Sequence, residues 1–275
     1  MQATNQETVV GESMGGTLRF THLTTRPQFA RRISQPPKLL DLLDIIAGGN
    51  GSGRQRERGL DPTTGMEDPI FVLGERIGDG KYHPVSWHRL IDGVFIPGKG
   101  PVQIDSAGGA FDGFRATSDS TWGSIWPRAA EIDSAYERRG WIYEIERSEQ
   151  FMPERLGMIG VCPNVGWTFD LAAVREMYKS VRPDRLRTIA GLGNRVDFAD
   201  PFDGKIDLWV IVDGEARFNR LGMMRKDGAI EIDVKLKTTD RFLTLAVTDG
   251  GDGQAGDWVI FGDPVIQTKH IEENP

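Results

Sequence analysis

Cysteine is almost absent from this sequence, because Cys162 is the single one among 275 residues. A lone cysteine excludes an internal disulfide and a thiolate metal cluster. Basic residues are also outnumbered, 33 against 40 acidic ones, which gives a net charge of -7 and a pI near 5.2. This balance disfavours nucleic acid and anionic membranes as partners, since both call for a basic surface.

Long apolar runs are missing as well. No stretch approaches the roughly 20 apolar residues of a membrane span, and residues 1–20 lack the basic and then apolar order of a signal peptide. The chain is therefore expected to be either intracellular or a mature piece of a longer exported protein, and the sequence does not separate the two.

Signals for catalysis are also weak. No His-Glu-x-x-His motif occurs, and the 40 acidic residues are too many for one catalytic pair to be singled out. With 39% apolar and 27% charged residues, the composition is that of a globular domain. A binding domain is therefore expected rather than an enzyme.

Residues 1–78 are expected to form an N-terminal flank. Residues 17–23 alternate apolar and polar side chains and predict a short strand. Residues 39–47 predict one short helix that Gly48 and Gly49 stop. The Gly-rich and then basic stretch 49–62 lacks the Gly-Lys-Ser/Thr ending of a phosphate loop, so a surface loop is expected.

Residues 79–268 have the sequence pattern of a β protein, in which Gly, Pro and Asp separate short apolar runs. A charged stretch at about 128–156 interrupts them and is expected to be an inserted, partly helical excursion, with Ile132, Ala135, Tyr136 and Arg139 at helical spacing. After the strand-like run 165–169, Asp170 is expected to cap a helix from Leu171 to about Lys179 that Pro183 ends. Strands are then expected at 186–191, 206–212, 230–236 and 241–247.

The expected strand 230–236 has the clearest pattern. Ile230, Ile232, Val234 and Leu236 alternate with charged residues, which predicts one buried and one solvated face. Asp213-Gly214 marks a hairpin turn. Several strands at this spacing, without a visible internal repeat, predict a sandwich or barrel rather than βαβ units or a propeller.

The loop at 248–257 carries the densest set of carboxylates. Asp249, Asp252 and Asp257 lie among four glycines, between the apolar runs 242–247 and 258–261, which are expected to form two strands joined by this loop. Three interpretations stay open: a site for a hard cation such as Ca²⁺, the mouth of a polar binding site, or a surface turn whose aspartates bond backbone N–H groups.

Several motifs carry a resemblance to a known family. They are Gly160–Leu171 (GVCPNVGWTFDL), Leu208–Gly214 (LWVIVDG) and Leu245–Gly253 (LAVTDGGDG), followed by Asp257-Trp258. In order and spacing this part of the chain resembles the NPCBM/NEW2 domain family, a carbohydrate-binding-module type. Upstream, Asp92–Pro97 and Phe111–Phe114 resemble the front half of extended versions found in large bacterial surface proteins.

The resemblance implies an all-β fold, namely a jelly-roll-like antiparallel β-sandwich with a few short helices over residues 79–268. It also implies a glycan or polysaccharide partner bound in loops at one end, calcium in some members, and an extracellular, cell-surface or periplasmic location. The chain departs from the family at Cys162-Pro163-Asn164, where members usually have His-Ala-Asn. Of that motif, Asn164 is retained, and its amide can both donate to and accept from a sugar.

Sugar binding needs an exposed aromatic plate beside amides and carboxylates. The candidates for the plate are Trp87, Trp122, Trp126 and Trp167, and the candidate polar partners are Asp112, Asn164, Asn194 and Arg225. Trp209 and Trp258 sit inside apolar runs and are expected in the core.

Two hypotheses follow from these observations. The first is a noncatalytic carbohydrate-binding β-sandwich. The second is a structural or adhesion scaffold whose sugar site has decayed and which binds other domains or proteins. An open cleft around Asn164 and Trp122 would favour the first, and a filled one the second.

Overall fold

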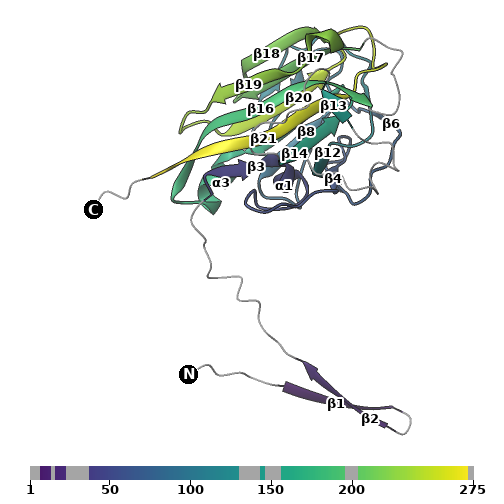
Figure 1. Ribbon diagram of the computed structural model, residues 1–275, viewed down its shortest axis with the longest axis vertical. Coiled ribbons are helices and arrows are strands. Elements are labelled where there is room, and N and C mark those ends of the chain that lie inside the picture. Colours follow the sequence, from purple (N-terminus) through teal and green to yellow (C-terminus); the bar gives the residue numbers. More distant parts are fainter. Residues whose placement is uncertain are drawn as a thin grey trace. The chain divides into compact units, whose positions relative to one another are not determined.

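The computed structural model describes residues 7–13, 16–22, 37–129, 143–145, 156–195 and 204–271. The chain divides into two compact units, residues 1–36 and 37–275. The first contains an antiparallel pair, β1 (Glu7–Ser13) and β2 (Gly16–His22), in which Glu7 lies opposite His22 (Figure 1). The strand predicted at 17–23 is thus confirmed as β2.

The second unit is built on two antiparallel sheets (Figure 1). The first sheet has the order β12-β14-β21-β16-β13, with β19 also paired to β16 and β3 to β21. Its strands are β3 (Leu39–Asp41), β12 (Trp126–Ala129), β13 (Tyr143–Ile145), β14 (Gly157–Val161), β16 (Val181–Arg195), β19 (Ile230–Lys235) and β21 (Val259–His270).

The second sheet has the order β18-β17-β20-β15-β8-β7. Its strands are β7 (Tyr82–Pro84), β8 (Ile91–Phe95), β15 (Val165–Asp170), β17 (Lys205–Val212), β18 (Glu215–Met224) and β20 (Phe242–Thr248). Short pairs flank the sheets: β4 (Gly59–Leu60) with β5 (Glu67–Asp68), β6 (Glu75–Ile77) with β11 (Ser120–Trp122), and β9 (Val102–Gln103) with β10 (Ala110–Phe111).

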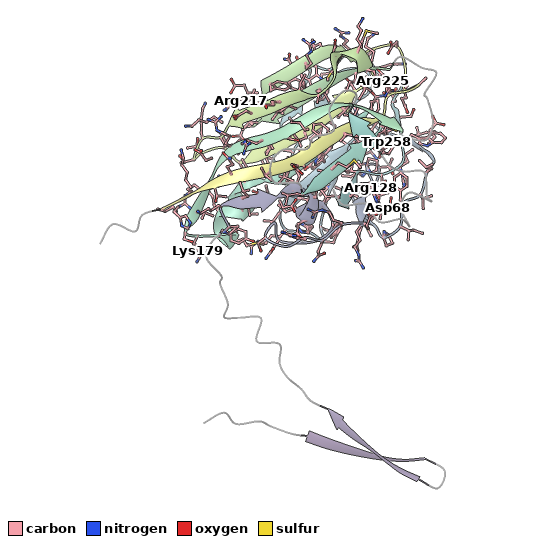
Figure 2. The ribbon with its side chains drawn as sticks, in the orientation of Figure 1. Asp68, Arg128, Lys179, Arg217, Arg225 and Trp258 are labelled. Atoms are coloured by element: carbon pink, nitrogen blue, oxygen red, sulfur yellow. The ribbon has the colours of Figure 1, made fainter. Side chains whose placement is uncertain are left out.

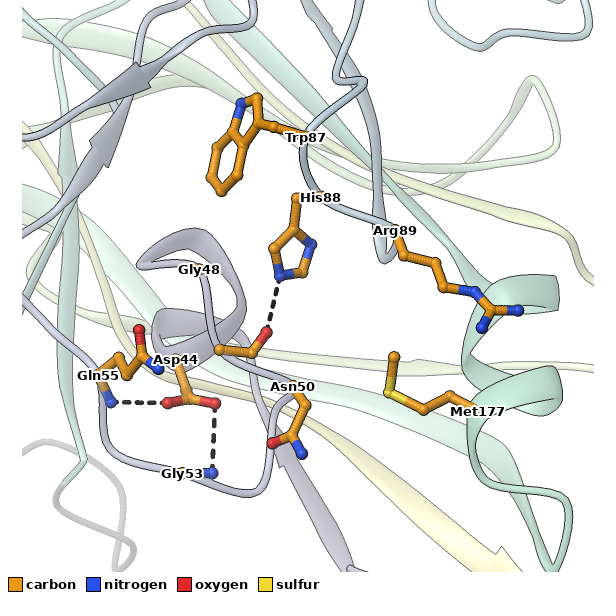
Figure 3. A pocket seen from close by; sticks show the side chains of 10 residues that line it. Asp44, Gly48, Asn50, Gly53, Gln55, Trp87, His88, Arg89 and Met177 are labelled. Carbon is orange, nitrogen blue, oxygen red and sulfur yellow. Dashed lines mark hydrogen bonds between the residues drawn. The ribbon is translucent and has the colours of Figure 1, made fainter. Parts of the chain in front are cut away.

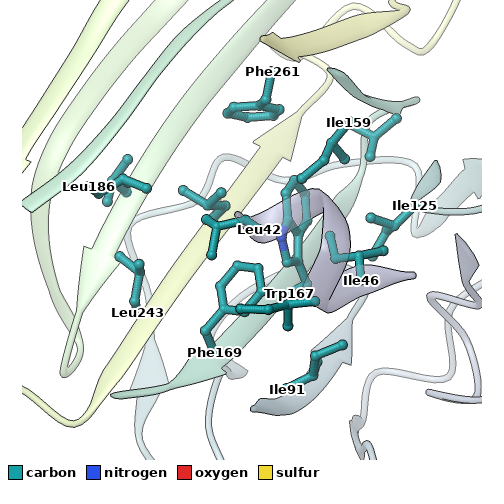
Figure 4. Packing of buried hydrophobic residues seen from close by; sticks show 14 of the residues in the cluster. Leu42, Ile46, Ile91, Ile125, Ile159, Trp167, Phe169, Leu186, Leu243 and Phe261 are labelled. Carbon is teal, nitrogen blue, oxygen red and sulfur yellow. The ribbon is translucent and has the colours of Figure 1, made fainter. Parts of the chain in front are cut away.

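The main hydrophobic core lies between the two sheets (Figure 4). Trp167 of β15 and Phe261 of β21 meet there edge to face, with ring centroids 5.5 Å apart, although they belong to different sheets. Both side chains are completely shielded from solvent. Sheets that pack face to face in this way make a β-sandwich, so the predicted fold class is confirmed.

The second sheet also buries its other face. Trp209 of β17 packs there against Phe111 and Phe114, with centroids 5.5 Å away in each case. Because both faces are covered, all seven residues of β20 are buried. This explains why the run Phe242–Thr248 is almost continuously apolar instead of alternating. β19 in the first sheet does alternate, with Ile232 and Val234 buried between exposed charged residues, as its pattern predicts.

Two short helices close the ends of strands. Asp170 caps α3 (Leu171–Met177) by accepting hydrogen bonds from the backbone N–H groups of Ala172 and Ala173 at 2.7 and 2.9 Å, as predicted. Asp41 caps α1 (Leu42–Ile46) by accepting from Leu43 N at 2.9 Å. A 3₁₀ turn, η1, spans Arg225–Asp227. No helix among the described residues is both long and apolar enough to span a bilayer.

Three local predictions need correction, and a fourth lies outside the described residues. The helix predicted over 39–47 begins only at Leu42, because residues 39–41 pair with the edge of β21. Residues 37–78 are not a separate flank, since they lie in the same compact unit as the sandwich. The predicted helical positions 132–139 lie outside the described residues. Within the same predicted insertion, residues 143–145 are described and form strand β13. Pro183 does not terminate the helix, which ends at Met177.

Pro183 instead lies within β16, next to a register shift between Pro183 and Arg185. A proline cannot donate to a strand ladder and is tolerated at such an irregularity. The pair of strands on either side of the 248–257 loop is also not a hairpin. β20 pairs with β15 and β17, whereas β21 pairs with β14 and β16, so the loop crosses from one sheet to the other.

We predict that Trp167→Ala lowers the free energy of unfolding by about 3–5 kcal/mol, because it leaves a cavity between the sheets. Urea denaturation measures the change. Ile77→Ala is the control, since Ile77 is 73% exposed and its loss should change the free energy by less than about 0.5 kcal/mol. Equal effects of the two substitutions would show that Trp167 does not anchor the core.

Candidate functional site

The 248–257 loop packs against two other segments at one end of the sandwich. Asn164, which precedes β15, is fully buried between them. Its side-chain Nδ2 lies 3.1 Å from Asp249 Oδ2, 3.2 Å from Ser118 Oγ and 3.2 Å from the Ser120 carbonyl. Its Oδ1 accepts from Asp249 N at 2.9 Å. The amide is therefore used inside the protein and not offered to a ligand.

Gln254 closes the same region from the loop side. Its Nε2 reaches Ser118 Oγ at 2.9 Å and Ser120 Oγ at 2.8 Å. We call Ser118, Ser120, Asn164, Asp249 and Gln254 the loop cluster. Because its members bond one another, the cluster is filled by its own side chains, which is the arrangement that the scaffold hypothesis expects.

The three aspartates of the loop lie in different environments. Asp249 is buried and also accepts from Gly251 N at 3.0 Å. Asp252 is exposed, and its Oδ2 pairs with Lys205 Nζ at 3.1 Å. Asp257 is buried, accepts from Lys205 N at 2.8 Å with Oδ1, and has no hydrogen-bond partner for Oδ2 among the described residues.

Calcium prefers six to eight oxygen ligands. In the described residues, no group of three or more His, Cys, Asp or Glu side chains gathers in a way that could hold a metal. Most of the loop's carboxylate oxygens already accept protein donors, and the Lys205 ammonium lies beside Asp252. The loop as folded therefore fits a cation poorly, and the calcium site stays a prediction.

Burial, aided by the negative charges of Asp252 and Asp249, raises the pKa of Asp257 to about 8, although the Lys205 N–H and Arg225 oppose the shift. Burial, and then the charge of Asp257, also raises the pKa of the Cys162 thiol. Since the thiolate is the reactive form of cysteine, Cys162 is not suited to act as a nucleophile.

The Asp257 carboxyl makes stability depend on pH. Its pKa in the folded protein lies above the ordinary value of 3.8, so the folded state retains a proton that the unfolded state loses between about pH 4 and pH 8. Stability should therefore fall as the pH rises through this window.

We predict that Asp257→Asn removes this dependence, because the amide keeps an oxygen for Lys205 N and carries no charge. Unfolding measured at pH 5 and pH 9 should show the variant more stable than the natural protein at pH 9, by on the order of a few kcal/mol, with a smaller difference at pH 5. Parallel pH profiles for the two proteins would contradict the assignment.

The structure separates the other predicted sugar-binding residues. Trp122 is 45% exposed, whereas Trp126 and Trp167 are buried. The Trp126 indole N–H donates to Glu57 at 3.2 Å. Trp126 and Trp167 therefore cannot stack on a sugar in this conformation. Trp209 is buried as expected, and Trp258 is half-buried against Ile260 and its neighbours.

Of the polar candidates, Arg225 contacts the same loop as Asn164, because one guanidinium nitrogen donates to the Gly256 carbonyl at 2.8 Å. Asp112 is exposed. The side chain of Asn194 lies outside the described residues. The role of the predicted set in sugar binding stays a prediction.

A pocket of about 420 Å³ lies elsewhere, beside Trp87 (Figure 3). We call it the Trp87 pocket; it is lined by Asp44, Gly48, Gly49, Asn50, Gly53, Gln55, Trp87, His88, Arg89 and Met177. These residues come from α1 and the loop after it, from the segment before β8, and from α3.

The Trp87 pocket and the loop cluster lie at opposite ends of the sandwich. Phe169, near the end of β15, pairs with Ile91 at the start of β8, just after Trp87–Arg89, whereas Asn164 precedes the start of β15. Figure 2 shows the same separation, with Arg225 and Trp258 at one end and Lys179, just after α3, at the other.

Asp44 determines the shape of the loop that forms one wall of the pocket. Its buried carboxylate accepts three backbone N–H groups: Gly51 at 2.8 Å, Gly53 at 3.2 Å and Gln55 at 2.6 Å. A Cβ atom at Gly49 would lie 2.2 Å from that carboxylate, and one at Gly53 2.7 Å. The glycines of this loop are thus needed for close approach to Asp44, and not for a phosphate.

His88 links the other wall to this loop. Its Nε2 lies 2.7 Å from the Gly49 carbonyl and its Nδ1 accepts from Leu90 N at 3.2 Å, which fixes a neutral ring with the proton on Nε2. Burial lowers the pKa of His88, in agreement with this assignment. His88 therefore positions the loop and does not act as a base.

The sequence contains a Gly-x-Ser-x-Gly match at Gly11–Gly15. A nucleophilic serine of that type requires a strand followed by a helix. Here Gly11–Ser13 lie within β1, which pairs with the following strand β2, so the setting of Ser13 is not that of a nucleophile elbow.

Two packed antiparallel sheets joined by loops at their ends define a β-sandwich domain. Residues 131–267 match the NPCBM/NEW2 domain model. The resemblance found in the sequence is therefore confirmed over this segment. No curated protein matches the chain.

Solved structures that are similar to the chain are CBM51 modules. One is CBM51 from Clostridium perfringens GH95 in complex with methyl-galactose, which is 23% identical and has a TM-score of 0.34. The match covers 40% of this chain and 69% of the CBM51 chain. Another is the tandem CBM51 of the family 98 glycoside hydrolase from Streptococcus pneumoniae: identity 13%, TM-score 0.40, coverage 55% and 43%. A third is CBM51-2 with GlcNAc and INT domains from Clostridium perfringens ZmpB: identity 13%, TM-score 0.35, coverage 74% and 41%. The chain thus spans less than half of the second and third of these.

Proposed function

We propose that this protein is a noncatalytic carbohydrate-binding domain whose partner is a glycan or polysaccharide. The observation that carries the proposal is the NPCBM/NEW2 match over residues 131–267. This segment holds β14 to β20 and most of β21, and so contributes strands to both sheets. It supplies the rigid frame on which loops can hold a sugar.

The use of the buried carboxylates supports a binding role rather than catalysis. Asp44 holds the loop of the Trp87 pocket. Asp207 accepts from Gly222 N at 2.6 Å, and Asp263 accepts from Leu156 N at 2.6 Å and Gly157 N at 2.9 Å. Asp249 belongs to the loop cluster. These four carboxylates are committed to protein donors and position loops, which does not suit them to general acid–base work, whereas Asp257 keeps one buried oxygen without such a donor among the described residues.

We further propose that the domain acts outside the cytoplasm, as part of an exported bacterial protein, because cell-surface and extracellular polysaccharides are the partners that such a module would meet there. Cell fractionation with an antibody against the domain tests this location.

We predict that the protein binds glycans on an array that includes galactose-, N-acetylgalactosamine- and uronate-containing structures. Isothermal titration with the best array sugar should then give saturable heat, and binding should release no reducing sugar over long incubation. Heat-unfolded protein is the control. Absence of binding to every glycan would overturn the proposed function, and released sugar would overturn the noncatalytic part.

Calcium binding by the 248–257 loop is a separate proposal, supported by the buried and unpartnered Oδ2 of Asp257. If the loop rearranges around Ca²⁺, 5 mM CaCl₂ should raise the melting temperature relative to EDTA, because a ligand that binds only the folded state stabilises it. Asp252→Asn should abolish the rise. An unchanged melting temperature in the natural protein would exclude the site.

The scaffold alternative is favoured by two observations. The loop cluster is closed by Gln254, and apolar side chains stand exposed nearby: Ile77 is 73% exposed and, on the paired strand β11, Trp122 is 45% exposed. Exposed apolar patches mark interaction surfaces. The array separates the two functions, since a scaffold with a decayed site binds no glycan.

A further inference from the structure

We propose that the Trp87 pocket, and not the loop cluster, is the sugar site, and that it takes an uncharged terminal sugar residue of a glycan. The inference rests on the proposed function and assigns its location and ligand class. Its volume of about 420 Å³ lies near the lower end of the range for ligand pockets, which suits one or two sugar rings.

Trp87 supplies the apolar plate. Its indole N–H donates to the Gly65 carbonyl at 2.8 Å, and its ring stands edge to face with His88, with centroids 5.4 Å apart. These contacts fix the plane of a half-buried ring. Gly48, at φ +92°, lies beside the ring, since a Cβ there would meet it at 3.7 Å, in van der Waals contact. As a glycine it adds no side chain to the pocket next to the Trp87 ring, whose apolar surface can pack on the C–H face of a pyranose.

Two amides face the pocket with hydrogen-bonding capacity to spare. Asn50 Oδ1 accepts from Ser52 N at 3.0 Å and Ser52 Oγ at 2.7 Å, which turns its Nδ2 away as a donor. Within the described residues, no protein partner is recorded for the side-chain amide of Gln55. An amide that both donates and accepts matches a sugar hydroxyl, which does the same.

The loop that carries these amides is fixed before any ligand arrives. Asp44 holds three of its N–H groups, His88 holds the Gly49 carbonyl, and the Tyr178 hydroxyl donates to the Asn50 carbonyl at 2.8 Å. A loop tied from three elements loses little conformational entropy on binding, so weak individual contacts can yield measurable affinity.

The charges favour an uncharged ligand. An anion at a Gly-rich loop needs free backbone N–H groups, but those of Gly51, Gly53 and Gln55 already donate to the Asp44 carboxylate, which adds negative charge under the loop. Arg89, the cation among the lining residues, pairs with Glu176. A phosphate or sulfate is therefore disfavoured, whereas neutral hydroxyls meet the amides and the ring.

The test uses the full chain and the best neutral glycan from the array, measured by isothermal titration. Trp87→Ala should weaken binding by about tenfold or more, and Gln55→Ala by about threefold to tenfold, the range expected for a lost hydrogen bond. Gln55 is exposed, so its variant should fold even if Trp87→Ala does not. Ile77→Ala is the control and should bind normally. Inorganic phosphate at 10 mM should not compete.

The outcomes separate the two claims. If the natural protein binds a glycan but Gln55→Ala and a folded Trp87→Ala bind it equally well, the site assignment is overturned and the proposed function stands. Loss of binding in Trp122→Ala alone would move the site to the loop-cluster end. If the natural protein binds no glycan, both claims fall. Competition by phosphate would overturn the ligand class.

Discussion

Burial of apolar side chains between the two sheets is the interaction on which everything else in this domain depends. Trp167 and Phe261 meet at its centre, and residues of β8, β14, β16, β17, β20 and β21 pack around them. The second sheet is covered on its outer face as well, by Phe111 and Phe114 over Trp209. A sheet buried on both sides cannot shift its register without exposing apolar side chains, so the positions where loops leave it are fixed.

Buried carboxylates then hold the loops in place on this fixed frame by accepting hydrogen bonds from them. Asp44, Asp249 and Asp263 each accept two or more protein donors, mostly backbone N–H groups of nearby irregular segments. Removing such a carboxylate from water is costly, and the charge-assisted hydrogen bonds offset that cost. A domain with this many glycine-rich loops relies on such bonds to hold them in single conformations.

The sequence predicted the fold class and most strands because their patterns are local. The alternation over 230–236 and the apolar runs at 206–212 and 242–247 correspond to β19, β17 and β20. The motif around Asn164 identified the family. The sequence pattern did not reveal that β20 and β21 belong to different sheets, because the choice of sheet depends on partners distant in the chain.

The candidate site was harder to predict than the fold for the same reason. Exposure of a tryptophan is a tertiary property, so Trp122, Trp126 and Trp167 looked alike in sequence but differ in burial. The glycines at 49 and 53 were visible, yet their purpose depends on Asp44 lying beneath them, five and nine residues earlier. Trp87 was one of four candidate plates, but Asn50 and Gln55, which line the same pocket, lie more than 30 residues away in the sequence.

In the Gly49–Gln55 loop, one carboxylate accepts three backbone N–H groups. The backbone conformation of the loop is therefore set separately from the chemistry of its exposed side chains. Its course is dictated from within, by Asp44, while the side chains of Asn50, Ser52 and Gln55 point outward and carry little of the folding energy. Related chains that keep the aspartate and the glycines could exchange those outward residues freely. Such a loop keeps one backbone conformation while its exposed side chains vary, so its ligand preference can change without a change of fold.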